Sequence, residues 1–554
     1  MKKNIGRTSA LIIIIMTWLM SMSFGQTPYF DQTKDGFLVF HEIKTDEQGK
    51  IIPWYHTEPG ISYDFVIKAV WNFWDTMRID MNGLPYYMNH QVWRPEVNDR
   101  RGIGGDQISM ALSSWRLLYQ YSGWEKVKEN MMFLADYNLT HSLSLGDAAW
   151  PDIPYPYNNL RYSGTYTGDM VIGMGYTQPD KAGSFGYEVF RLYQMTGTRA
   201  YLDAAEKIAR TLAMHIREGD DDHSPLPFKV HAITGEVGKL KSNRGSDEEA
   251  GESGYTTNWT AMLRLFLGLI DMNKDTDGSL QHGFEITLDW MKEYPMKTNK
   301  WGPFFEDIPG WSDTQTNAIS FAHFMMDYPD YFAGWEKDVE GIFDWVYEKL
   351  GNSAWEKYGV TVVNEQTVYQ TPGNSHTSRQ ASMELLYCYL TGKDRRKNNA
   401  IRQLNWATYM VDNDGKNCYP RDEVWLTDGY GDYVRHFLRS MAAFPVLAPS
   451  NGNHILKSTS VISQADYNPD FHKKLAPDFS KEESSSTLLF YKTYDNSSTE
   501  ILRLVSRPSR VLVNHREIME QRKPDIEGWH WEPLDKGGIL TITHQNGNHI
   551  RVIK

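Results

Sequence analysis

The chain has 554 residues, and 70 acidic against 57 basic side chains give it a formal net charge of −13. Because the basic residues are scattered and form no stripe, this acidic balance excludes nucleic acid as an expected partner. Cys388 and Cys418 are the only cysteines. Such a chain has no disulfide framework, and its length allows a core large enough to do without one.

The first 25 residues are expected to form a signal peptide and not part of the fold. Three basic side chains precede an apolar run at 10–22, and the small residues at 23–25 favour cleavage before Gln26. The run is shorter than the ~17–25 residues of a transmembrane helix, and no later stretch is apolar enough to span a bilayer. We therefore expect a periplasmic or secreted mature chain without a membrane span after signal cleavage.

Residues 26–57 show the pattern of a short N-terminal β-hairpin, with strand-like segments on either side of an Asp-Glu-Gln-Gly turn at 46–49. The apolar period then becomes helical, because apolar residues recur at every fourth position from Phe65 to Met77. The first helix of the main domain is therefore expected to follow the hairpin.

One short pattern recurs along the helical region. An apolar helix segment closes with Ser-Gly or Thr-Gly at Gly123, Gly197 and Gly392. Glycine suits the left-handed residue that ends a helix, and each glycine is followed by apolar residues four apart, which form one face of a second helix. Helical hairpins repeated over 58–450 predict a closed ring of helix pairs, an α/α toroid.

After residue 450 the pattern changes to short strands separated by turn residues. This change predicts a C-terminal antiparallel β domain over 451–554. The expected fold class is therefore mainly α, a toroid of helical hairpins followed by a smaller β domain.

Long polar stretches separate the expected helices, and loops of this length in a compact domain are usually functional. In a toroid they gather at one end and form a cleft. Aromatic rings with a polar edge suit the apolar faces of sugars, so Trp93, Trp150 and Tyr166 in these stretches are candidates for substrate binding. The alternative is that such rings fill the centre of the fold.

Several familiar chemistries leave no trace in the sequence. It has no His-Glu-x-x-His, no paired Cys-x-x-Cys, no phosphate-binding glycine loop and no Gly-x-Ser-x-Gly. Residues 273–278 have the spacing with which a calcium loop begins, but Phe284 stands where the bidentate acid belongs. We interpret the segment around Asp275 as a turn between helices, and we expect no metal and no cofactor.

Polar and titratable residues do cluster where inner helices are expected to start. The candidates for proton transfer are His90, Tyr255, His376 and Tyr430, and the candidates for substrate contacts are Asn89, Arg101 and Arg379. A histidine in such a place is often structural, but two of them beside tyrosine and arginine favour a catalytic site. The acids available for hydrolysis are Asp106, Asp169 and Glu252, although Asp106 also fits an N-cap.

Arg379 follows His376 by three residues, so both side chains can point to one face of the first helical turn. The loop that carries His376 is polar and Gly-rich and is expected to lie outside the core. The competing interpretation makes Arg379 a surface residue that pairs with Glu384 or with solvent.

The helix pairs closing in Tyr-x-x-Thr-Gly, the exported N-terminus and the β domain resemble the toroidal carbohydrate-processing enzymes of polysaccharide-degrading bacteria. These include polysaccharide lyases, unsaturated uronyl hydrolases, uronate epimerases and the oligosaccharide dehydratase type of ulvan degradation. The resemblance implies that Asn and Arg neutralise a uronate carboxylate while His and Tyr move protons. The residues that match by type and context are Asn89, His90, His376, Arg379 and Tyr430.

Three functions follow as hypotheses. The first is β-elimination on an acidic oligo- or polysaccharide. Pairing the uronate carboxylate with Arg and Asn stabilises the enolate, and a neutral histidine takes the C5 proton. The enzyme is a lyase if a glycosidic oxygen leaves C4 and a dehydratase if a hydroxyl leaves as water. The second is hydrolysis by two carboxylates that face each other across the cleft. The third is a glycan-binding protein without catalysis, because fold alone does not exclude it.

Overall fold

The computed structural model of the protein describes most of the chain between residues 39 and 554. The described residues are 39, 41–77, 79, 83–84, 105–155, 175–241, 249–304, 311–417, 430–467, 487–523 and 526–554. The predicted signal peptide lies outside them. Among the helices in these ranges, none combines the length and the hydropathy needed to cross a bilayer.

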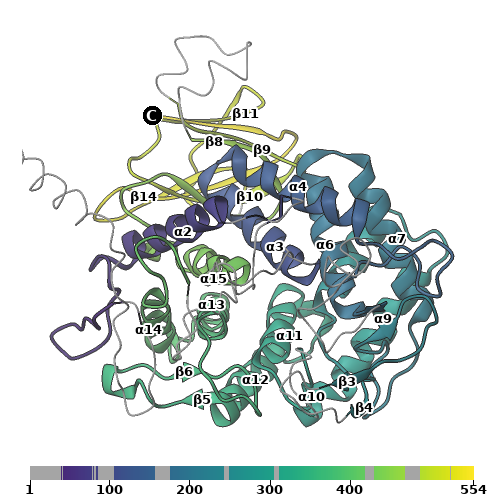
Figure 1. The fold of residues 1–554 in the computed structure, drawn as a ribbon. Helices are drawn as coiled ribbons and strands as arrows, with labels where there is room; N and C mark the ends of the chain where they lie inside the picture. Colours follow the sequence, from purple (N-terminus) through teal and green to yellow (C-terminus); the bar gives the residue numbers. More distant parts are fainter. Residues whose placement is uncertain are drawn as a thin grey trace, which may run out of the picture.

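Within the described residues, six helices form an inner ring in which each contacts the next and the last contacts the first (Figure 1). They are α3 (Gly105–Ser122), α6 (Pro179–Thr196), α8 (Thr260–Asp271), α11 (Gln315–Asp327), α13 (Asn374–Thr391) and α15 (Tyr430–Ala443). All six point in the same direction along the axis of the ring, because an antiparallel outer helix separates each from the next in the chain. Their N-terminal ends therefore meet at one end of the toroid.

An outer helix covers each inner one. Five follow their inner partner in the chain: α4 (Glu125–His141), α7 (Arg199–His215), α9 (Ser279–Glu293), α12 (Trp335–Leu350) and α14 (Lys397–Thr408). The sixth is α2 (Pro59–Thr76), which precedes all the others and packs on α15. The Tyr63 hydroxyl on α2 donates to the Asn405 side chain on α14 at 2.6 Å, so the start of the helical domain closes the ring at its end.

The repeated helix ends have the predicted geometry. Gly123, Gly197 and Gly392 adopt φ values of +67°, +73° and +72°, the left-handed conformation that glycine adopts without strain. The hydroxyl before each glycine donates to the carbonyl four residues earlier: Ser122 to Leu118, Thr196 to Leu192 and Thr391 to Tyr387, at 2.7, 2.8 and 2.7 Å. The Ser/Thr therefore satisfies one of the carbonyls left over at the helix end.

Short strands and helical turns lie in the segments that connect the long helices. Three two-stranded ribbons pair β1 (Tyr176–Thr177) with β2 (Val230–His231), β3 (Lys239–Lys241) with β4 (Glu249–Glu252) and β5 (Gly351–Asn352) with β6 (Val362–Val363). The helical pieces are α10 (Pro295–Thr298), η2 (Pro329–Tyr331), η3 (Glu356–Tyr358) and η4 (Pro445–Leu447). Of the expected N-terminal hairpin, the described part contains an antiparallel bridge between Thr45 and Ile51.

The C-terminal region consists of two antiparallel sheets (Figure 1). One has the order β13 (Gly528–Pro533), β14 (Gly538–His544), β10 (Ser498–Leu504), β7 (His454–Ser458). The other has the order β12 (Arg516–Ile518), β11 (Arg510–Val513), β15 (His549–Ile553), β9 (Thr487–Thr493), β8 (Ile462–Asp466). Strands β7 and β8 contact α3, and β7 also contacts α15. The predicted fold class, an α/α toroid with a C-terminal antiparallel β domain, is confirmed.

Candidate functional site

A cavity of about 360 Å³ occupies the centre of the inner ring, and all six inner helices contribute to its wall. The wall begins at residues in the first turns of their helices, such as Lys181 and Thr316, and continues to Arg439 and Asp327 near the other ends. The cavity therefore extends along the axis of the ring. Ser458 of β7 also lines it, so the β domain borders the same space.

The described wall of the cavity is rich in positive charge, although the whole chain is acidic. Its cations are Arg116, Lys181, Arg264, Arg379, Arg435 and Arg439, and its carboxylates are Glu188 and Asp327. Burying several cations around one space is costly unless anions accompany them. A lumen of this kind is suited to an anionic ligand.

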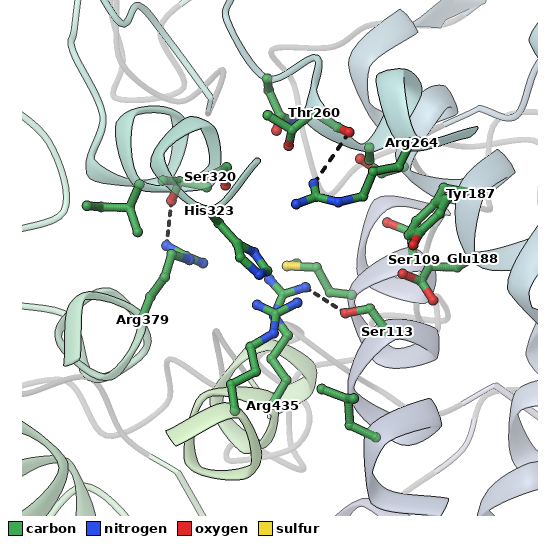
Figure 2. A pocket seen from close by; sticks show the side chains of 18 of the residues that line it. Ser109, Ser113, Tyr187, Glu188, Thr260, Arg264, Ser320, His323, Arg379 and Arg435 are labelled. Carbon is green, nitrogen blue, oxygen red and sulfur yellow. Dashed lines mark hydrogen bonds between the residues drawn. The ribbon is translucent and has the colours of Figure 1, made fainter. Parts of the chain in front are cut away.

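Asp432 holds two of these arginines in place. Asp432 is 2% exposed. Its carboxylate accepts a hydrogen bond from Arg379 and forms an ion pair with Arg435. Arg379 also donates to the Gln315 side chain at 3.1 Å and to the Thr316 hydroxyl at 2.7 Å. Arg435 donates to the Ser113 hydroxyl at 2.6 Å, as Figure 2 shows.

Arg379 is thus a residue of the cavity wall, as the catalytic interpretation required. The competing expectation, that it lies on the surface beside Glu384 or solvent, is wrong. Arg379 is 6% exposed, and its guanidinium pairs with Asp432. Glu384 instead lies 3.5 Å from Arg396. Arg379 points inward because α13 belongs to the inner ring and is buried along nearly all of its length.

Two further arginines are held by carboxylates farther along the axis. Arg116 on α3 makes a two-pronged contact with Glu188 on α6, at 3.1 and 3.4 Å. Arg264 on α8 donates to Asp327 on α11 at 2.7 Å. Near the start of the inner helices, Lys181 donates to Asp180 and to the Phe304 carbonyl, each at 3.0 Å.

His323 lies among these arginines near the centre of the cavity (Figure 2). Its Nε2 is 3.4 Å from the Asp327 carboxylate. Burial, with the charges of Arg439, Arg264 and Arg435, lowers the pKa of His323 to about 3, although Asp327 acts in the opposite direction. The imidazole is therefore neutral at ordinary pH and able to accept a proton.

Sequence reasoning missed His323 because it lies in an otherwise apolar helix and not in a loop. A signal was present: Thr316, Ser320, His323 and Asp327 are spaced four, three and four residues apart and all line the cavity. A polar stripe at helical spacing on a helix whose other faces are apolar marks the face turned toward a polar lumen.

His376 does not have the predicted environment. It belongs to the first turn of α13, is 3% exposed and is not among the residues that line the cavity. Burial first, and then the charge of Arg379, lowers its pKa well below the ordinary value. The expectation of a polar loop outside the core is wrong here because α13 already starts at Asn374, and its first turn is packed inside the ring.

Two other candidates also pack within the structure and away from the cavity wall. The Tyr255 hydroxyl donates to the Lys300 carbonyl at 2.6 Å, and burial raises the pKa of Tyr255 far above its usual range. Trp150 is 3% exposed and stacks on His215 with ring centroids 3.8 Å apart. Trp150 thus follows the alternative of an aromatic ring that fills the fold.

The remaining candidates fall on parts of the chain that the structure does not describe. Asn89, His90, Trp93, Arg101, Tyr166 and Asp169 lie outside the described residues. The backbones of Asp106, Glu252 and Tyr430 lie in α3, β4 and α15, and nothing is described of their side chains. Asp106 is the second residue of α3, so it falls inside the first turn of that helix.

The segment around Asp275 forms the predicted turn between α8 and α9. The two carboxylate oxygens of Asp275 accept the backbone amides of Leu280 and Gln281, at 3.0 and 2.9 Å. Asp275 therefore caps α9. No group of His, Cys, Asp and Glu side chains suited to a metal occurs among the residues that the structure describes.

No family model matches the chain, and no curated protein matches it. Solved structures do resemble its fold. The cellobiose 2-epimerase from Spirochaeta thermophila is 13% identical with a TM-score of 0.52, over 70% of this chain and 97% of that one. A sugar epimerase from a ruminal bacterium is 12% identical with a TM-score of 0.52, over 69% of this chain and 98% of that one. At these identities the likeness shows the fold alone, which is one used by carbohydrate-processing enzymes.

Proposed function

We propose that the cavity binds an acidic oligo- or polysaccharide and that the protein is a carbon–oxygen lyase acting by β-elimination on a uronate. The observation that carries the proposal is a neutral histidine set among arginines in a central cavity. An arginine can hold the carboxylate, and a neutral imidazole can take the neighbouring proton. As the sequence leaves open, the same chemistry yields a lyase or a non-reducing-end dehydratase according to the group on C4.

In the proposed reaction the positive charge of Arg379, whose guanidinium is held in place by Asp432, Gln315 and Thr316, attracts the uronate carboxylate. His323 takes the proton from C5, and the electron pair of that C–H bond forms the C4=C5 double bond as the C4–O bond breaks. The departing oxygen takes a proton from a tyrosine hydroxyl. Tyr187 is the tyrosine on the described cavity wall, and Tyr430 at the start of α15 remains the candidate from sequence.

The charge of the bound substrate is expected to raise the pKa of His323 and so to make it a stronger base. Burial first, and then the charges of the surrounding arginines, keep the pKa of His323 low in the free protein. A bound carboxylate offsets their charge, and a nearby negative charge favours the protonated imidazole. The proton affinity of His323 therefore rises when the acidic sugar is present, which ties base strength to substrate binding.

Hydrolysis is supported less well by the same geometry. A hydrolase needs one carboxylic acid that keeps its proton near neutral pH. Glu188 and Asp327 line the cavity, but each is bonded to an arginine. Burial alone would raise the pKa of Asp327, yet the charges of Arg264 and Arg439 and the hydrogen bond from Arg264 act against it, and that pKa is lowered overall. Asp327 is therefore an ionised partner and not a proton donor.

The test is to incubate the protein with a panel of uronate-containing polysaccharides and their oligomers. Elimination produces a conjugated double bond, read as a new ultraviolet absorbance, and a dehydratase also removes the mass of one water. Turnover that is lost in His323→Asn but retained in His282→Asn, an exposed histidine on α9, supports the proposal. Products that lack the double bond and gain one water would instead identify a hydrolase. Binding that is unchanged in His323→Asn, with no turnover on any substrate, would identify a binding protein.

We also propose that the protein is exported, with a mature chain that starts near Gln26. The supporting pattern is the basic, apolar and small-residue order of the first 25 residues. N-terminal sequencing of the protein recovered from its native compartment tests this, and an intact Met1 in the recovered protein would contradict it.

A further inference from the structure

The far part of the cavity contains a cation that has no paired carboxylate among the described residues. Five of the six cations on the described part of the cavity wall have a carboxylate partner: Arg116 with Glu188, Lys181 with Asp180, Arg264 with Asp327, and both Arg379 and Arg435 with Asp432. Arg439 makes no hydrogen bond, ion pair or ring contact with any residue that the structure describes. It is partly exposed, and the cavity is the space it lines.

From this we infer that Arg439, flanked by Arg264 and Arg116, forms a second anion-binding subsite for an oxyanion carried by the substrate, a sulfate ester or a second carboxylate. The inference rests on the proposed function for the statement that the substrate is a glycan. The anion site itself rests on the geometry of the three arginines and does not need catalysis.

The electrostatics of the free protein agree with a missing anion. Burial is the largest cause that lowers the pKa of Arg439, to about 10, and the charges of Arg264 and Arg116 act in the same direction. Asp327 and Glu188 oppose them only in part, since each is already bonded to its own arginine. Three guanidiniums that repel one another across a small space would be stabilised by an anion between them.

The position of Arg439 separates this subsite from the carboxylate site. Arg435 and Arg439 are four residues apart on α15 and line the same cavity, so they are about 6 Å apart along the helix axis. Arg435 belongs with Arg379 and Asp432, and Arg439 with the two arginines farther along. A substrate that carries two anionic groups can therefore occupy both levels at once.

Guanidinium chemistry favours the same class of ligand. Arginine binds sulfate and carboxylate oxygens through its fork of N–H donors. Arg116 and Arg264 keep their carboxylate partners through at least one nitrogen each, and Arg439 has its whole fork available to a ligand. A neutral sugar hydroxyl would leave the charge of Arg439 without a counterion, so the subsite would discriminate against uncharged sugars.

Inorganic sulfate is the first probe because it tests the subsite without turnover. Melting temperature is measured against sulfate concentration at constant ionic strength, with chloride as the balancing ion. The wild-type protein should show saturable stabilisation, and Arg439→Gln should lose it. Arg395→Gln is the matched control, since Arg395 is 73% exposed on the surface, and it should behave as the wild type. Without sulfate, Arg439→Gln should melt at the same temperature as the wild type or higher, because the substitution removes an unneutralised charge.

Matched oligosaccharides then identify the source of the oxyanion. One carries a uronate alone, one a uronate and a sulfate ester, and one two uronates. Loss of a charge-assisted contact should weaken binding of the cognate ligand to Arg439→Gln by about 10- to 100-fold, and leave the single-uronate ligand within about twofold. If Arg439→Gln binds the sulfated ligand more weakly, the subsite takes a sulfate ester. If it binds the ligand with two uronates more weakly, the subsite takes a second carboxylate.

The outcomes separate this inference from the proposed function. If Arg439→Gln binds sulfate and all three oligosaccharides as the wild type does, the subsite is overturned, whatever the protein catalyses. If sulfate and the doubly anionic sugars bind through Arg439 but no double bond forms, the subsite stands and elimination fails.

Discussion

At the scale of single residues, the wall of the cavity depends on what each arginine touches. Asp432 receives Arg379 and Arg435, and His436 lies 3.2 Å from the same carboxylate. Since one buried carboxylate fixes two cations, the geometry of Arg379 is set before any substrate arrives. Such preorganisation matters for catalysis because the group that binds charge in the transition state does not have to move.

Arg379→Lys retains the charge but loses the fork that contacts Asp432, Gln315 and Thr316 together. We expect kcat/KM on the uronate substrate to fall by about 10- to 100-fold with the fold intact. A loss in kcat would place the contact in the transition state, and a loss in KM alone would mean simple carboxylate binding. Arg395→Lys is the control, and equal kinetics for both variants would remove Arg379 from the site.

The pH dependence of kcat/KM reports groups of the free protein. Because the pKa of His323 is lowered to about 3, its neutral form persists well below pH 6.5. We expect the acid limb of the profile to lie far below that value. Arg439→Gln removes one charge that lowers this pKa, so the limb should move to higher pH. A limb that stays fixed between the two proteins would show that His323 is not the base.

These residues also show where sequence reasoning succeeds and where it stops. Arg379 was found because it belongs to a polar stretch at the start of a predicted helix. His323 was not, because its importance comes from five other helices that surround it and not from its neighbours in sequence. His376 was misread because a polar segment that is packed inside a ring has the same composition as an exposed loop.

At the scale of elements, the helical hairpins were predictable because their signals are local. A Ser/Thr-Gly end and apolar residues four apart are decided within two helical turns. The ring order, and the pairing of α2 with the last inner helix, depend on contacts between distant segments, which no local pattern encodes. The polar stripe on α11 that contains His323 lies between these cases. Its helical spacing can be read from the sequence, but the sequence does not show that this face of the helix lines a cavity.

The close approach of α6 and α8 depends on glycine. A Cβ at Gly183 would lie 2.8 Å from the Met262 Cβ, an atom fixed by the backbone of α8. We expect Gly183→Ala to destabilise the protein by about 1–3 kcal/mol through overpacking, as measured by denaturant unfolding. Gly341 on α12 is the matched control, because nothing lies within 4 Å of its added Cβ. Gly341→Ala should stabilise the protein by about 0.5–1 kcal/mol. A stable Gly183→Ala would mean that the two helices can separate without cost.

At the scale of the whole molecule, buried histidines make stability depend on pH. Burial is the largest cause that lowers the pKa of His41, His454 and His323, to about 4, about 4 and about 3. Each binds a proton more readily when unfolded. Their contribution is therefore complete above pH 6.5 and is lost as the pH falls toward the folded-state pKa, which is about 4 for His41 and His454 and about 3 for His323.

His454 offers the cleanest test, since it is 7% exposed and stacks on Tyr121 at 3.9 Å. The shift of its pKa corresponds to at most about 3 kcal/mol of lost stability in acid. We expect the free energy of unfolding to fall between pH 7 and pH 4.5, and to fall less in His454→Gln. His282→Gln, at an exposed position on α9, should keep the wild-type slope. Equal slopes in all three proteins would show that His454 takes up its proton without opening the structure.

The pairing of α2 with α15 has a consequence for how the molecule is made. The Tyr63–Asn405 hydrogen bond joins positions 342 residues apart. Helix α2 can pack early on α3, because Trp71 and Trp74 both contact the ring of Trp115, but its contacts with α14 and α15 must wait until those helices exist. At ~5–20 residues per second on the ribosome, roughly 20–70 seconds pass between the synthesis of α2 and that of α15. During that interval the side of α2 that carries Tyr63, which later contacts Phe437 on α15, is open to chaperones and to aggregation. The ring therefore cannot close before its last inner helix is made, and its earliest described helix stays only partly covered until then.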